Sequence, residues 1–401
     1  MRPFADLVVL ELASVLAGPS VGQFLAELGA TVLKVESPHT RGDVTRGWCL
    51  PTEAETDRPA YFTAINWGKQ SLALDLAHPD GRALMHRLAA GSDVVLTSFR
   101  PGAAARLGAD VPTLRAASPR AVVASISGYG PDAPRAGYDA VVQAESGWMF
   151  MNGAPDGPPT KLPVALVDVL AAHQLKQAIL VALLERERTG EGAAVHVALF
   201  DAAVSALVNQ ASNWLTAGHS PQRMGSAHPN IAPYGSLLPT ADGHALLLAV
   251  GTDRQFAHLC AALNLDALPD DARFATNASR VQHRAALEAR LAPAIRMHDR
   301  DTLLATLHAR YVPAGAVRSL PEVFEQPGPR AQVVRAEGLA DQGLAAVRQV
   351  AFRMDGAAVG PLAPPPSYAA DTVSVLRDRL HLGAAEIARL VEDGAIETAG
   401  A

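Results

Sequence analysis

The stretch LVVLELASVLAGPSVGQFLAELGATVLKVE, residues 7–36, sets two short apolar runs on either side of a helical pattern. Leu7–Leu12 and Thr31–Glu36 are typical of strands, and Ser20–Gly29 has its apolar residues at helical spacing. This order is that of a βαβ unit, in which the two strands run parallel. Strand and helix patterns continue to alternate after this unit. The further strand patterns are Ser71–Leu76, Asp93–Phe99, Ala121–Ser127 and Ala194–Leu199, and the helical patterns are Gly81–Ala90 and Asp168–Arg188. We therefore expect an α/β fold with an open, mainly parallel, Rossmann-like sheet and helices on both faces.

The second half of the chain has a different character. Gly218–Tyr234 is rich in Gly, Pro, His and Asn and has little periodicity, so it is expected to be a linker and loop. Ala241-Asp242-Gly243 between two apolar runs indicates a hairpin. Helical patterns follow, which together predict a smaller α+β domain: Arg254–Leu263, Ser279–Ile295 and Asp301–Arg310. Strand-like runs return after Arg335, and two short helices are expected at Asp371–Leu380 and Ala384–Glu392.

Composition narrows the class of partner. The 401 residues carry a formal charge of −6 without blocks of like charge, which disfavours a nucleic-acid partner and favours a small molecule. Cys49 and Cys260 stand far apart, which disfavours disulfides and thiolate metal sites and fits a reducing compartment, so we expect a cytoplasmic location. The first apolar run is too short to span a bilayer, so no membrane is expected. The 13 histidines show no metal-ligand spacing, and no metal is implied.

Two turns in the first half could meet a nucleotide-like ligand. Val15–Pro19 and the strand-ending Glu36 are similar to a dinucleotide-binding turn, but G-x-G-x-x-G is absent, which disfavours a nicotinamide cofactor. Phe99, Arg100 and Arg106 follow a predicted strand, at the sheet edge where open α/β folds bind ligands. Guanidinium groups pair with phosphates and a ring can stack on adenine, which suits CoA; the alternative is that these arginines are simply solvated.

Asp168 opens the long helical pattern. The plain interpretation is an N-cap, whose carboxylate accepts hydrogen bonds from N–H groups of the first turn. The functional interpretation uses the same physics, because those N–H groups and the helix dipole favour an anion, and a carboxylate can attack an activated carbonyl. The preceding residues 163–167 contain no other ionisable group, so the segment presents one acid in an apolar setting.

The chain resembles the class III CoA-transferases of the CaiB/BaiF type, a family that includes formyl-CoA and carnitine CoA-transferases and the related methylacyl-CoA racemases. The resemblance spans nearly the whole chain. It rests on Leu16–Pro19, Leu28–Glu36, Gly42–Arg46, Phe99–Gly102, Ser125–Gly130, Gly137–Asp139 and Asp168–Gly190.

The resemblance implies an interlocked homodimer and a chain that returns to its first domain. On this basis the expected divisions are a large CoA-binding domain over residues 1–200, a linker helix and loop over 201–234, a small α+β domain over 235–330, and a returning C-terminal segment over 331–401. No permanently bound cofactor is implied. The expected partners are an acyl-CoA, a free carboxylic acid and a second copy of the chain.

The resemblance also implies site residues. The nucleophilic aspartate of the family falls on Asp168, and Asp139 is expected near it. The CoA site is expected to be lined by Leu16, Ala17, Ile65, Asn66, Phe99, Arg100, Arg106, Arg135 and Tyr138. His228 and Asn230 are expected near the substrate, because Ala227–Tyr234 stands where formyl-CoA transferases have a glycine-rich loop.

Departures from the family pattern bear on the reaction. The racemases carry a histidine where Tyr138 stands, so racemisation is disfavoured. Leu16 and Ser37 replace a glutamine and a basic residue, so contacts to CoA must differ in detail. The form of the loop at residues 228–234 resembles that of enzymes that use succinyl-CoA with glutarate or similar dicarboxylates.

The expected reaction is CoA transfer from an acyl-CoA, for which succinyl-CoA is the first choice, to a free acid through an anhydride and a CoA thioester on Asp168. The alternatives are a 2-methylacyl-CoA racemase, a CoA hydrolase and a catalytically silent CoA-binding protein.

Overall fold

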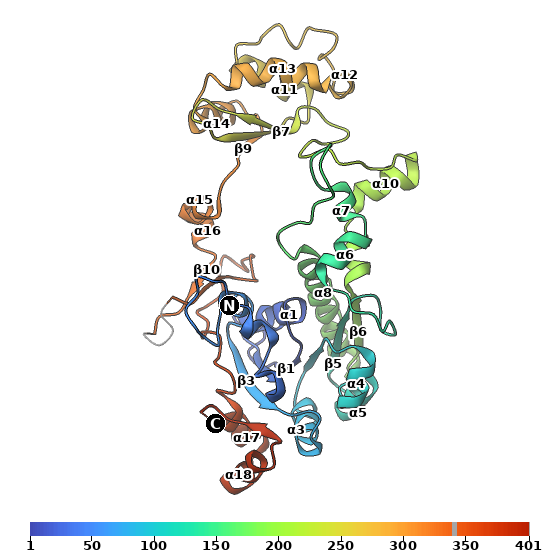
Figure 1. Cartoon of the computed structure of the whole chain (residues 1–401), viewed down its shortest axis with the longest axis vertical. Coiled ribbons are helices and arrows are strands. Elements are labelled where there is room, and N and C mark those ends of the chain that lie inside the picture. The colour runs from blue at the N-terminus through green and yellow to red at the C-terminus, as the bar shows by residue number, and fades with distance from the viewer. Residues whose placement is uncertain (339–342, 401) are drawn as a thin grey trace. The chain divides into compact units, whose positions relative to one another are not determined.

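The computed structural model describes residues 1–338 and 343–400. Its main sheet has seven strands in the order β12-β3-β2-β1-β4-β5-β6, and all neighbours are parallel except the β12–β3 pair (Figure 1). These strands are β1 Val8–Leu12, β2 Thr31–Glu36, β3 Lys69–Leu74, β4 Val94–Thr97, β5 Val122–Ser127, β6 Ala194–Ala198 and β12 Ile396–Glu397. The expected open, mainly parallel α/β sheet is confirmed.

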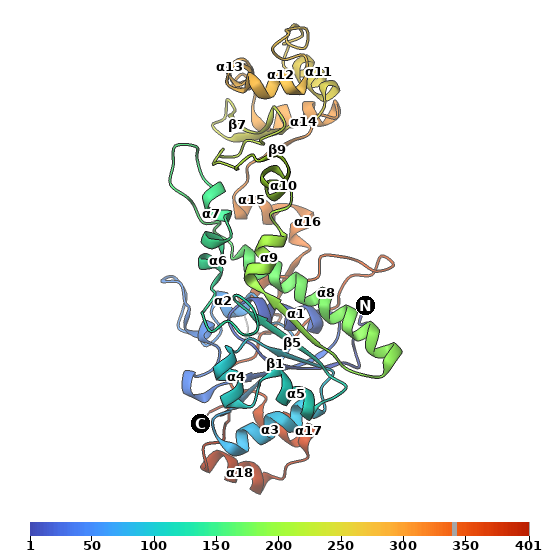
Figure 2. The same ribbon diagram turned by 90° about the vertical axis from the view of Figure 1, so that its right-hand side faces the viewer.

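Helices cover both faces of this sheet (Figure 2). On one face lie α1 (Ala17–Glu27) and α8 (Leu166–Thr189), which pack against each other. On the other face lie α3 (Pro79–Ala90), α5 (Val111–Ala117) and α17 (Thr372–Leu380). Among the described residues, α8 is the one helix long and apolar enough to cross a membrane. The core helix of a soluble protein passes the same test, and α8 packs on α1, β5 and β6.

The strand order creates a switch point between β1 and β4. From β1 the chain moves outward through β2 and β3, and then returns to place β4 on the other side of β1. The connections therefore diverge at the carboxyl ends of β1 and β4 and leave a crevice there, the usual ligand position in such sheets. Short helices complete this region: α2 Ala60–Thr63, α4 Pro101–Leu107, α6 Asp139–Glu145 and α9 Leu199–Ser205.

By its internal contacts the chain forms two compact units. Unit 1 comprises residues 1–146, 162–211 and 331–401, and unit 2 comprises residues 147–161 and 212–330. The expected linker over 201–234 is divided between the units after residue 211. Residues 147–161, expected in the large domain, group with unit 2 and contain α7 (Trp148–Met151). Arg223 donates hydrogen bonds to the carbonyl oxygens of Gly157 (3.0 Å) and Phe150 (3.1 Å), so this segment is tied to unit 2.

Unit 2 contains a small antiparallel sheet of β7 Tyr234–Pro239, β8 Ala245–Ala249 and β9 Ala314–Ala316, and the expected hairpin joins β7 to β8. Its helices are α11 Asp253–Ala262, α12 Asn277–Gln282, α13 Arg284–Ile295, α14 Arg300–Ala309, α15 Leu320–Glu325 and α16 Pro327–Arg330. The single helix expected over residues 279–295 is divided at His283, whose backbone leaves the helical region.

The remaining elements lie at the unit boundary and in the last part of the chain. The helix expected over residues 202–215 is two helices, α9 and α10 (Val208–Ala217), because Val208 has a φ of 42°. The strand-like run expected after Arg335 includes residues 339–342, which lie outside the described residues; on either side of them β10 (Val333–Arg335) pairs with β11 (Ala345–Val347). Helix α18 spans Ala384–Glu392 as expected.

Candidate active site

A cavity of about 400 Å³ opens at the switch point, and all of its lining residues belong to unit 1. We call it the Asp168 cavity. It is lined by Ser14–Gly18 after β1, Ser98–Arg100 and Ala103 after β4, Ile126–Gly128 at the end of β5, Ala136–Tyr138 before α6, and Asp168 and Leu199. Among the described residues, Asp168 is the one carboxylate in this lining.

Asp168 is the third residue of α8, and Ala165 is the N-cap. The interpretation of Asp168 as the N-cap is therefore wrong. Burial, and secondly the negative charge of Asp139, raise the pKa of the Asp168 carboxyl to about 7. Its position in the first turn places the carboxylate where the helix dipole favours an anion. At neutral pH a large fraction of Asp168 is thus ionised in spite of its poor solvation.

Asp139 links α6 to the beginning of α8. Its Oδ1 accepts a hydrogen bond from the N–H of Val167 at 2.8 Å, and its Oδ2 accepts one from Nε2 of Gln143 at 2.7 Å. Asp139 is itself buried. Asp139 therefore lies near Asp168, held there through the residue directly before it.

The residues expected to contact CoA fall into three groups. Leu16, Ala17, Phe99, Arg100 and Tyr138 line the Asp168 cavity. Two arginines lie outside this lining. Arg106 is exposed on α4, and Arg135 is exposed, paired with Glu145 and stacked 3.8 Å from the ring centre of Tyr129.

The third group, Ile65 and Asn66, lies in the interior. Ile65 lines a separate cavity that shares Leu16 with the Asp168 cavity. Asn66 has no exposed surface, and its Oδ1 accepts a hydrogen bond from the Lys69 ammonium at 2.9 Å. The Asn66 side chain therefore makes its hydrogen bond to Lys69 in the protein interior.

His228 and Asn230 belong to unit 2 and precede β7, so their expected place near the substrate stays a prediction. Their loop is held by side chains of α12 and α13. Asn277 donates to the carbonyl oxygen of Asn230 at 2.9 Å, and Arg284 donates to those of His228 (2.6 Å) and Ile231 (3.1 Å). Asn277 and Arg284 thus hold the loop through its backbone carbonyl oxygens.

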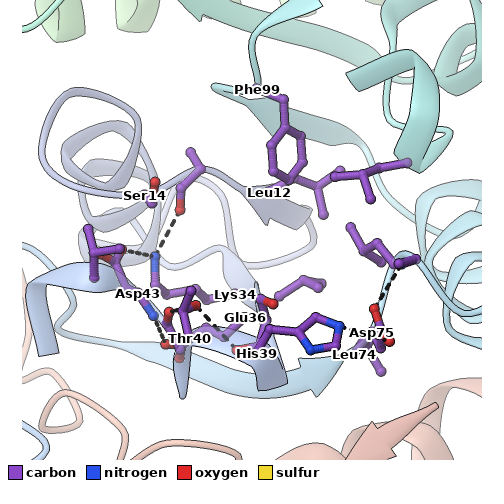
Figure 3. A pocket seen from close by; sticks show the side chains of 18 residues that line it. Leu12, Ser14, Lys34, Glu36, His39, Thr40, Asp43, Leu74, Asp75 and Phe99 are labelled. Atoms are coloured by element: carbon purple, nitrogen blue, oxygen red, sulfur yellow. Dashed lines mark hydrogen bonds and ion pairs between the residues drawn. The ribbon is translucent and has the colours of Figure 1, made fainter. Parts of the chain in front are cut away.

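A second cavity, of about 230 Å³, lies at the carboxyl ends of β1, β2 and β3 (Figure 3). Its lining includes Phe99 and Ser14, which also line the Asp168 cavity. His39 and Asp75 face each other across one side, with Nε2 and Oδ2 3.1 Å apart. We call it the His39 cavity. Sequence reasoning missed His39 and Asp75, because neither stands in a recognisable motif.

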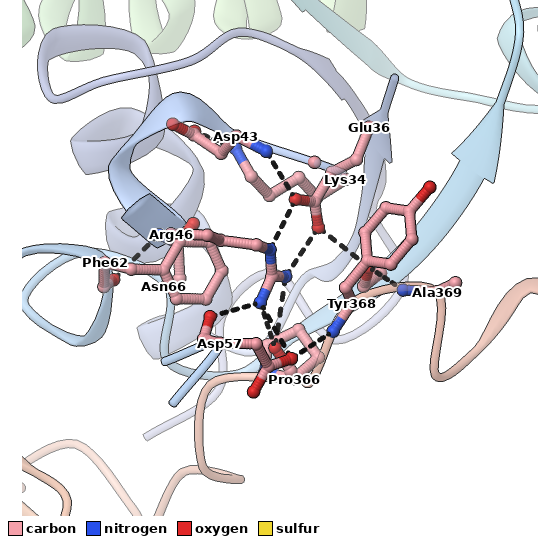
Figure 4. A network of polar contacts seen from close by, with 12 residues as sticks. Lys34, Glu36, Asp43, Arg46, Asp57, Phe62, Asn66, Pro366, Tyr368 and Ala369 are labelled. Carbon is pink, nitrogen blue, oxygen red and sulfur yellow. Dashed lines mark hydrogen bonds and ion pairs between the residues drawn. The ribbon is translucent and has the colours of Figure 1, made fainter. Parts of the chain in front are cut away.

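A network of buried charges includes Lys34, Glu36 and Asp43 of the His39 cavity lining (Figure 4). The Lys34 ammonium contacts Glu11 Oε1 at 3.0 Å and Asp43 Oδ2 at 2.9 Å, and Arg46 forms a 2.7 Å pair with Glu36. The sequence placed Lys34 and Glu36 in a strand, but it did not indicate that their charged groups are buried.

Asp43 connects this network to the Asp168 cavity. Its carboxylate accepts the N–H of Val15 at 3.3 Å. Val15 lines the Asp168 cavity and has a φ of 72°, an unusual backbone conformation for a β-branched residue. Asp43 therefore stabilises the turn that faces Asp168. Within residues 1–338 and 343–400, no cluster of three His, Cys, Asp or Glu side chains could hold a metal ion.

Comparisons with known proteins agree on one family. The sequence model described as CoA-transferase family III matches residues 4–372. The chain is 41% identical over 348 residues to the succinate–glutarate CoA-transferase of Agrobacterium fabrum, covering 85% of this chain and 86% of the relative. It is 34% identical to the succinyl-CoA:glutarate CoA-transferase of Mus musculus, covering 99% and 91%. The crystal structure of a CAIB/BAIF family protein from Brucella suis aligns with a TM-score of 0.80 and 40% identity, covering 93% and 98%.

Proposed function

The chain belongs to CoA-transferase family III, and we propose that it moves CoA from succinyl-CoA to a free dicarboxylic acid by forming an anhydride on Asp168. The observation that carries the mechanism is the position of Asp168: a poorly solvated carboxylate, in the first turn of α8, that faces the cavity at the sheet's switch point. The relatives named for succinate, succinyl-CoA and glutarate support the substrate class.

In the first half-reaction, an Asp168 oxygen attacks the thioester carbonyl of the donor. The carbon–sulfur bond breaks, CoA leaves as a thiolate, and the acyl group stays on Asp168 as a mixed anhydride. The bound thiolate then attacks the aspartyl carbonyl. This releases the donor acid as its carboxylate and leaves CoA on Asp168 as a thioester.

In the second half-reaction the acceptor acid reverses these steps. Its carboxylate attacks the aspartyl thioester and frees the CoA thiolate, which attacks the acceptor's carbonyl and regenerates the Asp168 carboxylate. No net proton is consumed. Each covalent intermediate is an anhydride or a thioester, so the free energy of the donor's thioester bond is retained.

Two features of the cavity assist this chemistry. The first N–H groups of α1, which include those of Ala17 and Gly18, have no acceptors within the helix and carry the positive end of its dipole. They can stabilise the oxyanion that develops when the thioester carbonyl is attacked. Burial removes water from the Asp168 carboxylate, which makes it a stronger nucleophile and protects the anhydride.

The His39 cavity is the proposed place for the nucleotide end of CoA. It shares Phe99 and Ser14 with the Asp168 cavity, so one extended ligand can occupy both. Phe99 offers a ring for stacking, and its neighbour Arg100 lines the Asp168 cavity.

The proposed assembly is a homodimer. On α8 the side chains of Val181 and Leu184 are exposed by 68% and 57%, and Val208 at the start of α10 is exposed by 68%. Exposed large apolar side chains of this kind are typical of surfaces that are covered in an assembled protein. The cytoplasmic location stays a prediction.

The decisive experiment is to trap the intermediate. Wild-type protein incubated with succinyl-CoA should gain the mass of CoA, and hydroxylamine should convert Asp168 to a hydroxamate that peptide mass spectrometry locates. Asp168→Asn should form no adduct and lose transfer activity by at least about a thousandfold while still binding CoA. Asp132→Asn, which removes an exposed carboxylate, is the matched control. Turnover by Asp168→Ala at the wild-type rate would refute the mechanism.

A further inference from the structure

Lys176 is a buried cation that lacks a carboxylate partner among the described residues. Two other buried lysines each pair with a carboxylate: Lys34 with Glu11 and Asp43, and Lys69 with Glu11, all at 2.9 to 3.0 Å. Lys176 is only 5% exposed. Within the part of the chain that the structure describes, its polar contact is one 3.3 Å hydrogen bond to Oε1 of Gln349, and the Phe24 ring lies 5.2 Å away.

Glu27, the carboxylate whose charge acts on Lys176, already has hydrogen-bond donors of its own. Glu27 accepts hydrogen bonds from the backbone N–H groups of Gln349 (2.8 Å) and Val350 (2.9 Å) and from the side chain of Gln23 (3.0 Å). Burial lowers the pKa of Lys176 to about 8, and Glu27 opposes that shift. Lys176 is thus still mainly an ammonium at neutral pH, with three N–H donors and one weak acceptor.

This ammonium borders a largely apolar cavity. The cavity has a volume of about 360 Å³ and lies in unit 1, and we call it the Lys176 cavity. Ser20, Lys176 and Gln349 are its polar lining residues, and the rest of the described lining is aliphatic. A cation in such surroundings costs free energy unless an anion joins it, so an anionic group with an apolar stem fits this space.

The Lys176 cavity adjoins the nucleophile. Leu16 lines both cavities, and the neighbours Asp168 and Val169 line one each. Asp168, Ala172 and Lys176 follow one another at intervals of four residues, which places them on one face of α8 over about 12 Å of helix. Ala172, between the two charged groups, is small and leaves room along this face.

We propose that the Lys176 cavity is the subsite for the distal carboxylate of the dicarboxylate acyl group, with Lys176 as its counter-ion. This inference rests on the proposed function, because it assumes that the thioester carbonyl is held at Asp168. The aliphatic chain then runs along Ala172 past Leu16, and the distal carboxylate accepts charge-assisted hydrogen bonds from Lys176. The site thereby distinguishes dicarboxylates from monocarboxylates of equal chain length.

The test compares two CoA thioesters in the donor half-reaction. Succinyl-CoA and butyryl-CoA have acyl chains of equal length, but only succinyl-CoA carries a distal carboxylate. The rate at which each forms the CoA adduct on the protein is measured by rapid quenching and intact-protein mass spectrometry. Wild-type protein should react faster with succinyl-CoA.

In Lys176→Met the rate with succinyl-CoA should fall by roughly 10- to 100-fold and the rate with butyryl-CoA should be unchanged. Lys176→Arg should keep most of the preference, and Lys161→Met, which removes the charge of an exposed lysine, should keep all of it. Gln349→Glu is an independent variant that keeps Lys176 but gives it an internal carboxylate, and it should also abolish the preference. Thermal melting establishes that each variant is folded.

The outcomes separate the two proposals. If neither thioester forms an adduct with wild-type protein, the proposed function fails. If adducts form but wild type shows no preference for succinyl-CoA, or if Lys176→Met and Gln349→Glu leave that preference intact, the Lys176 subsite is refuted while the function of Asp168 stands.

Discussion

Asp139 accepts a 2.8 Å hydrogen bond from the N–H of Val167, and so the carboxylate that begins α6 is fixed beside the residue before Asp168. The contact has two effects. It holds the first turn of α8 in place, and it keeps a second negative charge close to Asp168, which raises the pKa of the Asp168 carboxyl.

The first prediction concerns pH. Asp168 must be ionised to attack, so the rate of adduct formation in wild-type protein should rise with pH through about 7. Asp139→Asn removes the neighbouring charge while its amide oxygen can still accept the Val167 N–H. The pKa of Asp168 should then fall, and the midpoint of the profile should move down by about one pH unit. Glu145→Gln, which neutralises an exposed carboxylate at the other end of α6, should leave the midpoint in place. An upward shift of the midpoint in Asp139→Asn would contradict the prediction.

The second prediction concerns stability. Because folding raises the pKa of Asp168, the folded state binds this proton more tightly than the unfolded state, and ionisation disfavours folding. The penalty is absent below the ordinary pKa of an aspartate, grows as the pH rises to about 7, and is constant above that. Asp168→Asn cannot ionise, so its free energy of unfolding should exceed that of wild type by up to about 4 kcal/mol at pH 8. Urea unfolding at pH 8 and pH 4 measures the difference, and an equal value at both pH values would rule out ionisation of Asp168 as its cause.

The third prediction concerns Gly22 in α1. A methyl group added there would overlap the carboxylate of Glu11, which is buried and pairs with both Lys34 and Lys69. Gly22→Ala should therefore lower the free energy of unfolding by about 3 kcal/mol or more, although alanine favours helices. In Gly102→Ala, in α4, the added methyl group meets no described atom within 4 Å, and this variant should be neutral or stabilised by up to about 1 kcal/mol. Similar stabilities for the two variants would show that Glu11 can move aside at little cost.

The fourth prediction concerns Asp43. Asp43→Ala removes one of two carboxylates from the buried Lys34 and leaves the Val15 N–H without its acceptor. The loss should be about 3 kcal/mol, because a buried ion is left with an incomplete set of partners. Asp271→Ala breaks a solvent-screened surface pair with Arg273 and should cost much less. Chemical denaturation of both variants compares them, and a cost for Asp43→Ala no larger than that for Asp271→Ala would mean that solvent reaches Lys34.

Some features of this protein follow from local sequence. The βαβ pattern of residues 7–36 predicted β1, α1 and β2 closely, because the period of apolar residues records which face of each element is buried. The same reasoning predicted α8 and placed Asp168 near its beginning. The motifs at Leu16, Phe99 and Tyr138 indicated residues that the fold does bring into one cavity with Asp168.

Other features depend on contacts between residues far apart in the chain. The antiparallel strand β12, near the end of the chain, pairs with β3 near its beginning, and no local pattern records such a pairing. Asp139 meets Val167 across 28 residues. Lys34 and Lys69 are charged residues in strands, and both are buried against Glu11, a partner that neither strand's own sequence identifies.

The sequence alone therefore determined the type of sheet, the family and the acid that we assign as nucleophile, since these depend on local periodicity and on short motifs. Only the tertiary structure decided which charges are buried and which of them have partners. Lys176 illustrates the reason: on the helical pattern it is one polar residue among many, and its solvation and its neighbours are set by α1, β11 and Gln349, which the chain brings beside it only when folded.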